Sequence, residues 1–108
     1  MTDARISGAA LTTTRNYESW EQKLRDKSGR SRIRRYFERF LESGQLGSNA
    51  KAIGGGVTEI RFNFGQGYRV YVAQKPEMGL VLLCGGDKSS TSGQNSDVRL
   101  ARSLAAAI

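Results

Sequence analysis

The sequence predicts an α+β fold: an antiparallel sheet of three to four strands with an N-terminal helical hairpin packed on one face and a C-terminal helix. Apolar residues recur at helical spacing near the N-terminus, two segments alternate around a glycine-rich turn, and one apolar run suits a buried strand. The 108 residues provide one modest core, so we expect a single domain over 1–108, with 1–14 a poorly defined strand or tail.

The N-terminal part of the chain predicts a helical hairpin after a short strand near residues 8–13. Asn16 is a candidate cap for the first helix, whose apolar face has i, i+3, i+7 spacing and comprises Tyr17, Trp20 and Leu24. Gly29 interrupts this pattern. A second helix is expected from about residue 30 to 43, before Gly44 in the left-handed conformation. Its predicted buried stripe comprises Ile33, Phe37, Phe40 and Leu41.

Two alternating segments, "VTEIRFNF" and "YRVYVA", predict a β-hairpin around Gly65–Gly67. A three-residue loop pairs Phe62 with Val70 and Ile60 with Val72, which keeps the apolar side apolar. A one-residue slip would mix the two faces. On the opposite face this register places Arg61 beside Tyr71 and Asn63 beside Arg69.

The C-terminal third predicts one more strand and one more helix. "LVLLC" is apolar throughout and indicates a central strand covered on both sides. The polar segment after it, "GGDKSSTSGQNS", is expected to be a loop. Ser96 is a candidate N-cap for the last helix, whose apolar stripe would comprise Val98, Ala101, Leu104 and Ala105.

The charge balance favours a polyanionic partner. Seventeen Lys and Arg residues against ten Asp and Glu give +7, and twelve of the seventeen are arginine, which binds phosphate bidentately. Solubility alone would also explain some of the excess positive charge. With no histidine and one cysteine, a metal site is not expected, and we predict no cofactor. The lone Cys84 and the lack of a signal or membrane segment favour a cytoplasmic protein without membrane contact.

One face of the predicted sheet gathers groups suited to RNA cleavage. It carries Glu59, Arg61, Arg69 and Tyr71, while Lys88 leaves the end of the neighbouring strand and Lys51 precedes the hairpin. Arginines can stabilise the charge that builds on a phosphate attacked by a 2′-hydroxyl, and Lys, Tyr or Glu can move protons. The alternatives are an ordinary cross-strand charge pair and a face that only binds nucleic acid or protein.

A second basic cluster lies on the second predicted helix. It allows two interpretations: docking on an RNA backbone, as on a ribosome, or a solvated helix face with Glu38 and Glu42 as local partners. The cluster comprises Arg30, Arg32, Arg34, Arg35 and Arg39.

Three motifs in order, "GVTEIR", "GYRVY" and "CGGDKSS", together with "DVRLA", resemble the RelE/ParE superfamily of toxins from type II toxin–antitoxin modules. The branch most similar is the HigB-like group of addiction module killer proteins, and the resemblance covers residues 17–101. It implies a small α/β toxin that cleaves mRNA, commonly on the ribosome. It also implies a cognate antitoxin, often of the helix-turn-helix type, encoded by the adjacent gene.

The resemblance assigns expected roles to single residues. Arg61 matches the arginine that binds the scissile phosphate, Arg69 a second basic position of the sheet, and Lys88 the basic end of the last strand. Lys51 falls where the family places a basic residue before a glycine-rich turn, although Gly55 replaces the glutamate expected there. Tyr68 or Tyr71 would replace a tyrosine that the last helix lacks. A ParE-like inhibitor that binds DNA gyrase and a non-catalytic nucleic-acid-binding module are the alternative functions.

Overall fold

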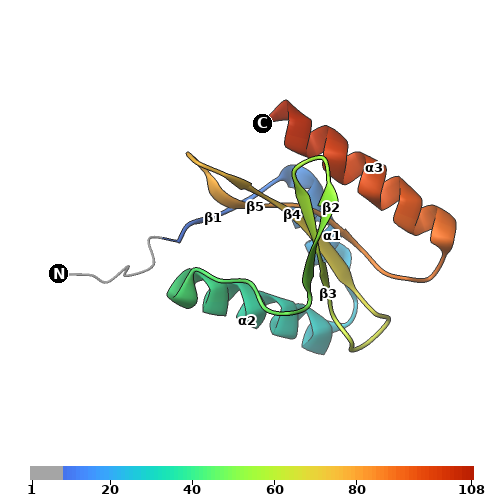
Figure 1. The fold of residues 1–108 in the computed structure, drawn as a ribbon. Coiled ribbons are helices and arrows are strands. Elements are labelled where there is room, and N and C mark those ends of the chain that lie inside the picture. The colour runs from blue at the N-terminus through green and yellow to red at the C-terminus, as the bar shows by residue number, and fades with distance from the viewer. Residues whose placement is uncertain (1–8) are drawn as a thin grey trace.

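A five-stranded sheet forms the middle layer of the protein in a computed structural model that describes residues 9–108 (Figure 1). Its strands lie in the order β1-β5-β4-β3-β2. The short β1 pairs in parallel with β5, and all other neighbours are antiparallel. The strands are β1 (Leu11–Thr13), β2 (Ala50–Gly54), β3 (Val57–Arg61), β4 (Arg69–Lys75) and β5 (Gly79–Gly86).

Helices cover both faces of this sheet. α1 (Arg15–Lys23) and α2 (Lys27–Ser43) lie on one face, and α3 (Thr91–Ala107) lies on the other (Figure 1). Two apolar layers result. Ile33 and Phe37 of α2 pack in one with Ile60, and Ala101 of α3 packs in the other with Val81. The predicted α+β fold, with a helical hairpin on one face and a C-terminal helix, is therefore confirmed.

The sheet has one strand more than the sequence analysis predicted. β2 was missed because "AKAIG" is short, does not alternate clearly and ends in glycines. Lys51 therefore lies within a strand and not ahead of the hairpin. At the N-terminus, the part of the predicted strand near Gly8 lies outside the described residues, and the strand is present over Leu11–Thr13.

The helical hairpin begins differently from the prediction. Thr14, and not Asn16, caps α1 by accepting a hydrogen bond from the N–H of Tyr17 at 3.1 Å. Asp26 caps α2 through the N–H of Gly29 at 2.8 Å, so Gly29 lies inside the helix. Gly44 ends α2 at φ 74°, as expected.

Leu41 does not join the buried stripe of α2. Its side chain is 39% exposed, whereas the other three predicted members, Ile33, Phe37 and Phe40, are buried. The stripe that faces the sheet is therefore narrower at this end of the helix than the apolar pattern suggests.

The register of the β3–β4 hairpin differs from the prediction by two residues. Ile60 pairs with Val70, and Arg61 pairs directly with Arg69. The predicted three-residue turn is wrong because the loop spans residues 63–67, where the N–H of Gly67 donates to the Phe64 carbonyl at 3.0 Å. A shift of two residues leaves every side chain on its predicted face, so the polar and apolar faces are as expected.

The segment after the last strand contains less loop than predicted. β5 continues to Gly86, and α3 begins at Thr91 with Ser90 as its cap, which accepts from the N–H of Gly93 at 3.0 Å. Ser96 therefore lies inside the helix. The predicted apolar stripe of this helix is confirmed, because Ala101 and Ala105 are buried and Val98 and Leu104 pack beside them. Within residues 9–108, no helix is long and apolar enough to cross a membrane.

Candidate active site

Polar side chains lie in two adjacent rows across the sheet. Residues that pair directly in an antiparallel sheet project to the same face. Because Tyr71 packs in the apolar layer with Ala101 of α3, both rows face the α3 side. One row comprises Lys51, Glu59, Tyr71 and Cys84, and the next comprises Arg61, Arg69 and Gly86.

Glu59 is buried between the two arginines of the second row. Its side chain is only 7% exposed, and its Oε1 lies 2.7 Å from Nε of Arg61. The other oxygen, Oε2, lies 3.9 Å from Nε of Arg69. A buried carboxylate is costly unless it is paired, and here both oxygens have a cation. The hydrogen bond to Glu59 also raises the pKa of Arg61 above its ordinary value, so that guanidinium stays charged.

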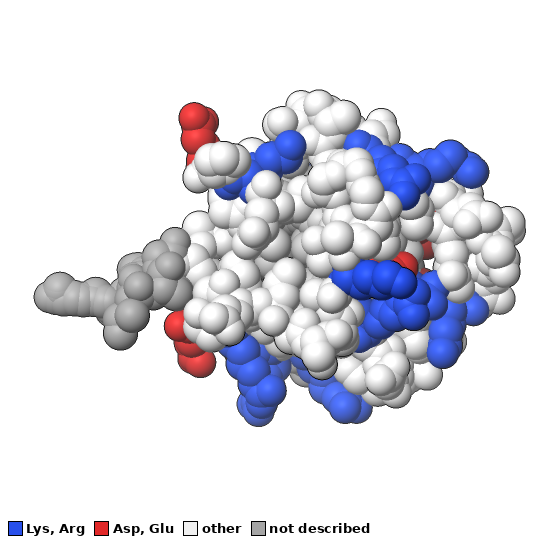
Figure 2. Space-filling model, viewed as in Figure 1, with Lys and Arg blue, Asp and Glu red and all other residues white. Residues whose placement is uncertain are grey.

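The arginines open onto a small hollow where the β3–β4 loop meets the end of β5. The hollow has a volume of about 100 Å³ and is lined by Arg61, Phe62, Asn63, Gly67, Tyr68, Arg69 and Lys88. The structure thus brings together Arg61, Arg69 and Lys88. In the view of Figure 2, Lys and Arg gather over the sheet between α2 and α3, and few acidic side chains reach this face.

Glycines place Lys88 at the rim of this hollow. Its aliphatic chain lies against Gly67, where a Cβ would approach the Lys88 Cε to 2.6 Å. Gly67 also has φ +75°, a conformation that glycine adopts without strain. At the end of β5, a Cβ on Gly85 would collide with the Trp20 ring, and one on Gly86 with the Asp97 carboxylate. Both glycines are therefore needed for β5 to pass between α1 and α3.

Tyr68 connects the hollow to the start of α2. Its hydroxyl donates to Oδ2 of Asp26 at 2.9 Å, while Oδ1 of the same carboxylate caps the helix. The hydrogen bonds from Gly29 and Tyr68 lower the pKa of Asp26. Burial, followed by the contact with Asp26, raises the pKa of Tyr68. The sequence analysis missed Asp26, although an aspartate three residues before Gly29 at a helix start is a recognisable capping signal.

Tyr71 lies behind the hollow and not on its surface. Its side chain is fully buried, and its hydroxyl has no hydrogen-bond partner within residues 9–108. Burial, followed by the charge of Glu59, raises the pKa of Tyr71 to about 12. The sequence placed Tyr71 on the correct face but did not indicate that α3 packs over this part of the sheet. A contact between this hydroxyl and RNA would require α3 to move.

Lys51 lies one row away from the arginines. It is exposed on β2, where it pairs directly with Glu59, and it does not line the hollow. Its side chain therefore flanks the buried carboxylate on the side opposite Tyr71. The structure places Lys51 beside the candidate site and not within it.

The basic side chains of α2 have different surroundings. Arg32 lies over the Phe64 ring, with its Cζ 4.0 Å from the ring centroid, which places one cation next to the β3–β4 loop. Arg35 and Arg39 are exposed and share a shallow surface hollow with Glu38 and Glu42, and Arg30 is half-buried.

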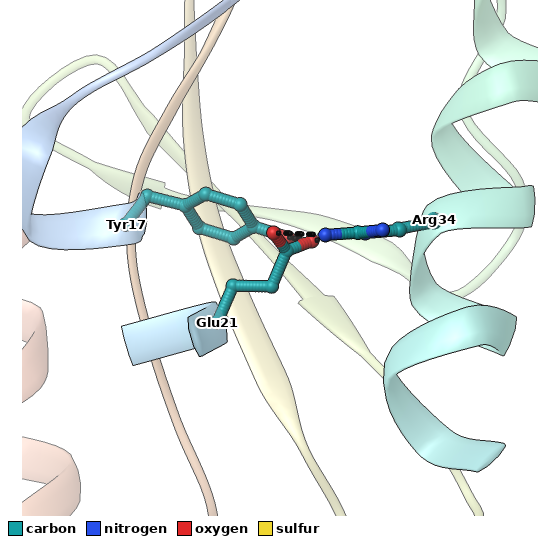
Figure 3. Close-up of polar contacts among 3 residues, drawn as sticks. All are labelled: Tyr17, Glu21 and Arg34. Atoms are coloured by element: carbon teal, nitrogen blue, oxygen red, sulfur yellow. Dashed lines mark hydrogen bonds and ion pairs between the residues drawn. The ribbon is translucent and has the colours of Figure 1, made fainter. Parts of the chain in front are cut away.

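Arg34 belongs to a different contact. Its Nε and Nη2 each bind an oxygen of Glu21 at 3.1 Å (Figure 3). Tyr17 points to the same carboxylate from α1, at 3.5 Å. Burial, followed by the charge of Glu21, raises the pKa of Tyr17. Arg34 thus joins α1 to α2 and is already occupied by a carboxylate. Residues 9–108 contain no group of three or more His, Cys, Asp or Glu side chains that could hold a metal ion.

Comparison with solved structures identifies the fold. A double arginine-to-alanine variant of the E. coli toxin RelE in the free state is similar, with a TM-score of 0.64 at 18% identity. The similarity covers 84% of this chain and 95% of that one. The crystal structure of the intact E. coli RelBE toxin–antitoxin complex is also similar, with a TM-score of 0.62 at 17% identity over 76% of this chain and 99% of that one. The protein therefore has a RelE-like fold.

Comparison of sequences identifies a family relationship. No family model matches the chain. A Haemophilus influenzae protein, described only as an uncharacterized protein, is 37% identical over 95 residues, which cover 88% of this chain and 91% of that protein. The chain belongs to the same family as this Haemophilus influenzae protein.

Proposed function

We propose that this protein is the toxin of a type II toxin–antitoxin module and that it inhibits translation by cleaving mRNA. The observation that carries the proposal is the hollow in which Arg61, Arg69 and Lys88 meet around the buried Glu59. The RelE-like fold supports it, because a structure of similar fold is described as a toxin. The three motifs of the sequence favour the HigB-like branch of the RelE/ParE superfamily.

The proposed reaction uses the side chains of this chain. The 2′-oxygen of one nucleotide gives its proton to a water molecule and bonds to the adjacent phosphorus, and the bond from phosphorus to the 5′-oxygen breaks. The 5′-oxygen leaves with a proton, so the products are a 2′,3′-cyclic phosphate and a 5′-hydroxyl end. Arg61 and Arg69 stabilise the charge on the phosphoryl oxygens. A hydrogen bond to Glu59 orients Arg61 before the RNA binds, and Arg69 lies within ion-pair distance of the same carboxylate.

The two lysines have supporting roles in this proposal. Lys88, at the rim of the hollow, positions the phosphate or supplies the proton to the leaving oxygen. Lys51, in the neighbouring row, holds a flanking phosphate. Tyr71 assists only if α3 moves, because its hydroxyl is buried in the present arrangement.

The partners follow from the same proposal. The exposed arginines of α2, Arg32, Arg35 and Arg39, with the half-buried Arg30, hold the RNA backbone, on the ribosome or beside it. The described structure of the RelBE complex pairs a toxin with an antitoxin. We therefore propose a cognate antitoxin for this chain, of the helix-turn-helix type and encoded by the adjacent gene, with both proteins acting in the cytoplasm.

Expression of Arg61→Ala in a bacterial host tests the proposed function. The wild-type chain should arrest growth and produce new mRNA ends that carry a 5′-hydroxyl, mapped by primer extension. Arg61→Ala should fold with lower stability, because Glu59 keeps only Arg69 as a partner, and should lose both effects, because one of the cations at the phosphate is gone. Arg99→Ala is the matched control, since it removes the same charge from an exposed position on α3.

Two results would contradict the proposal. Growth arrest without new mRNA ends, accompanied by a DNA damage response, would indicate a ParE-like inhibitor of gyrase. Expression of the soluble wild-type chain without any growth defect would indicate a nucleic-acid-binding module that is not a toxin.

A further inference from the structure

The turn that precedes β2 holds the main chain of Arg61. The N–H of Arg61 donates to the Asn49 carbonyl at 3.1 Å, and the Asn49 side-chain Nδ2 donates to the Arg61 carbonyl at 2.8 Å. In a regular antiparallel ladder the second bond would come from the main-chain N–H of the partner residue. The Asn49 amide takes that place. As a result, both main-chain polar groups of Arg61 are bonded to one residue.

Asn49 is in turn oriented by Tyr36 of α2. The Tyr36 hydroxyl donates to Oδ1 of Asn49 at 3.0 Å and accepts from the N–H of Gly47 at 2.9 Å. The ring is fixed by edge-on packing against Phe37 and Phe62, each with a centroid separation of 5.2 Å. Burial raises the pKa of Tyr36, so the hydroxyl keeps the proton that it donates.

The hydrogen bonds from Tyr36 to Asn49 and from Asn49 to Arg61 hold the main chain at the end of β3. Arg61 is the last residue of β3, and the loop of residues 63–67 follows shortly after it. Without the Asn49 side chain, the Arg61 carbonyl would lose its hydrogen bond, and only the N–H of Arg61 would remain bonded to this turn. The place at which Arg61 leaves the sheet fixes where its guanidinium can reach. Stabilisation of a transition state depends steeply on that placement.

We propose that Asn49, oriented by Tyr36, is the positioning residue for Arg61 in RNA cleavage. Neither Asn49 nor Tyr36 lines the hollow, so both act through Arg61 and not on the RNA. The inference rests on the proposed function for its catalytic consequence. Its structural part, the fixing of Arg61, is measurable without any reaction.

The first experiment measures cleavage of a short mRNA on purified ribosomes. Asn49→Ala should lower kcat by roughly 10- to 100-fold while KM changes little, because the charge of Arg61 is retained and only its placement changes. Tyr36→Phe should lower kcat by a smaller factor. The double variant should be no slower than Asn49→Ala, since both changes break one chain of hydrogen bonds.

Two substitutions of the same chemistry are the controls. Tyr17→Phe removes a tyrosine hydroxyl that contacts α2 through Glu21, far along the chain from Arg61. Asn95→Ala removes an exposed amide on α3. Both should cleave at the wild-type rate. An equal loss in these controls, a loss confined to KM, or a wild-type kcat in folded Asn49→Ala would overturn the proposal.

The second experiment separates this inference from the proposed function. In Asn49→Ala the carbonyl ¹³C signal of Arg61 should shift, because Nδ2 no longer donates to that carbonyl, and the NMR signal of the Arg61 Nε–H, which is bonded to Glu59, should shift as well. If the wild-type chain cleaves no RNA, the proposed function fails, and these two signals still decide whether Asn49 holds Arg61. Unchanged signals would overturn the positioning role.

Discussion

At the scale of single residues, the candidate site depends on a carboxylate that never needs to touch RNA. Glu59 is buried and holds one arginine that is 55% exposed and another that is 13% exposed. Both cations offset the free-energy cost of burying Glu59, so the loss of either should lower the stability of the protein. This arrangement keeps two positive charges close together in the empty site, where they would otherwise repel each other.

Tyr71 offers a test of the burial that α3 imposes. At pH 8, Tyr71→Phe should leave the free energy of unfolding unchanged or slightly higher, because the hydroxyl it removes has no hydrogen-bond partner within residues 9–108. In the folded wild-type chain the pKa is raised from 10.0 to about 12. The stabilisation from the neutral phenol is therefore complete below pH 10 and disappears as the pH rises towards 12.

Urea denaturation between pH 8 and pH 12 measures this difference. The wild-type chain should lose more stability than Tyr71→Phe as the pH rises above 10. Cys84 remains in both proteins, and burial raises the pKa of its thiol to about 12, so a shared alkaline loss should persist in the variant. Identical pH profiles for the two proteins would contradict the burial of Tyr71 beneath α3.

At the scale of elements, the ends of helices and strands decide which residues reach the hollow. α3 begins at Thr91, six residues before the predicted start near Asp97, and its later residues Val98 and Ala101 pack in one apolar layer with Tyr71. β5 ends at Gly86, so that Lys88 follows within two residues and lies at the rim. A different start for α3 would change the path of the chain around Lys88.

The start of α3 is testable with two serines. Ser90→Ala should destabilise the protein by about 1 kcal/mol, because the Ser90 hydroxyl accepts from the N–H of Gly93 as the N-cap. Ser96→Ala, inside the helix and exposed, should change stability little, since its hydroxyl accepts only a long 3.4 Å hydrogen bond from Arg99. Chemical denaturation of both variants gives the comparison. A larger loss of stability in Ser96→Ala than in Ser90→Ala would instead support Ser96 as the N-cap, as the sequence predicted.

The sequence predicted the elements whose apolar pattern is regular. Ile33, Phe37 and Phe40 recur at helical spacing, and "VTEIR" alternates, so the helical hairpin and the polar face of the sheet were found. β2 is short and runs into three glycines, and the first residues of α3 are polar. Neither segment has a regular apolar pattern, so its structure depends on contacts with distant parts of the chain. Tyr36 and Asn49, thirteen residues apart, carry no local signal for the hydrogen bond that joins them.

At the scale of the whole molecule, the protein has a net charge of +7, and its arginines differ in whether a carboxylate lies beside them. Arg34 is neutralised by Glu21, and Arg61 and Arg69 share Glu59. Arg35 and Arg39 remain exposed on α2. Under the proposed function, these exposed arginines contribute RNA affinity that depends on salt, whereas the arginines beside Glu59 act on the scissile phosphate.

The salt dependence of RNA binding measures this division. With an RNA whose 2′-hydroxyls are removed to prevent cleavage, Arg35→Gln with Arg39→Gln should decrease the magnitude of the negative slope of log K against log salt. The expected decrease is about 0.7 for each phosphate of the single strand that the protein no longer neutralises. Arg34→Gln removes a charge already bound to Glu21 and should leave the slope nearly unchanged. An equal decrease for Arg34→Gln would contradict the assignment.

The parallel pairing of β1 with β5 also has a consequence for the order in which the protein folds during synthesis. Leu11 pairs with Leu80, and the Thr14 hydroxyl, which caps α1, donates to the Leu83 carbonyl at 2.6 Å. Pairings so distant in sequence cannot form until β5 has left the ribosome. Lys88 follows β5 by two residues, so it leaves the ribosome directly after that strand. In a nascent chain, the contact of Thr14 with β5 and the placement of Lys88 beside the hollow therefore become possible almost together, late in translation.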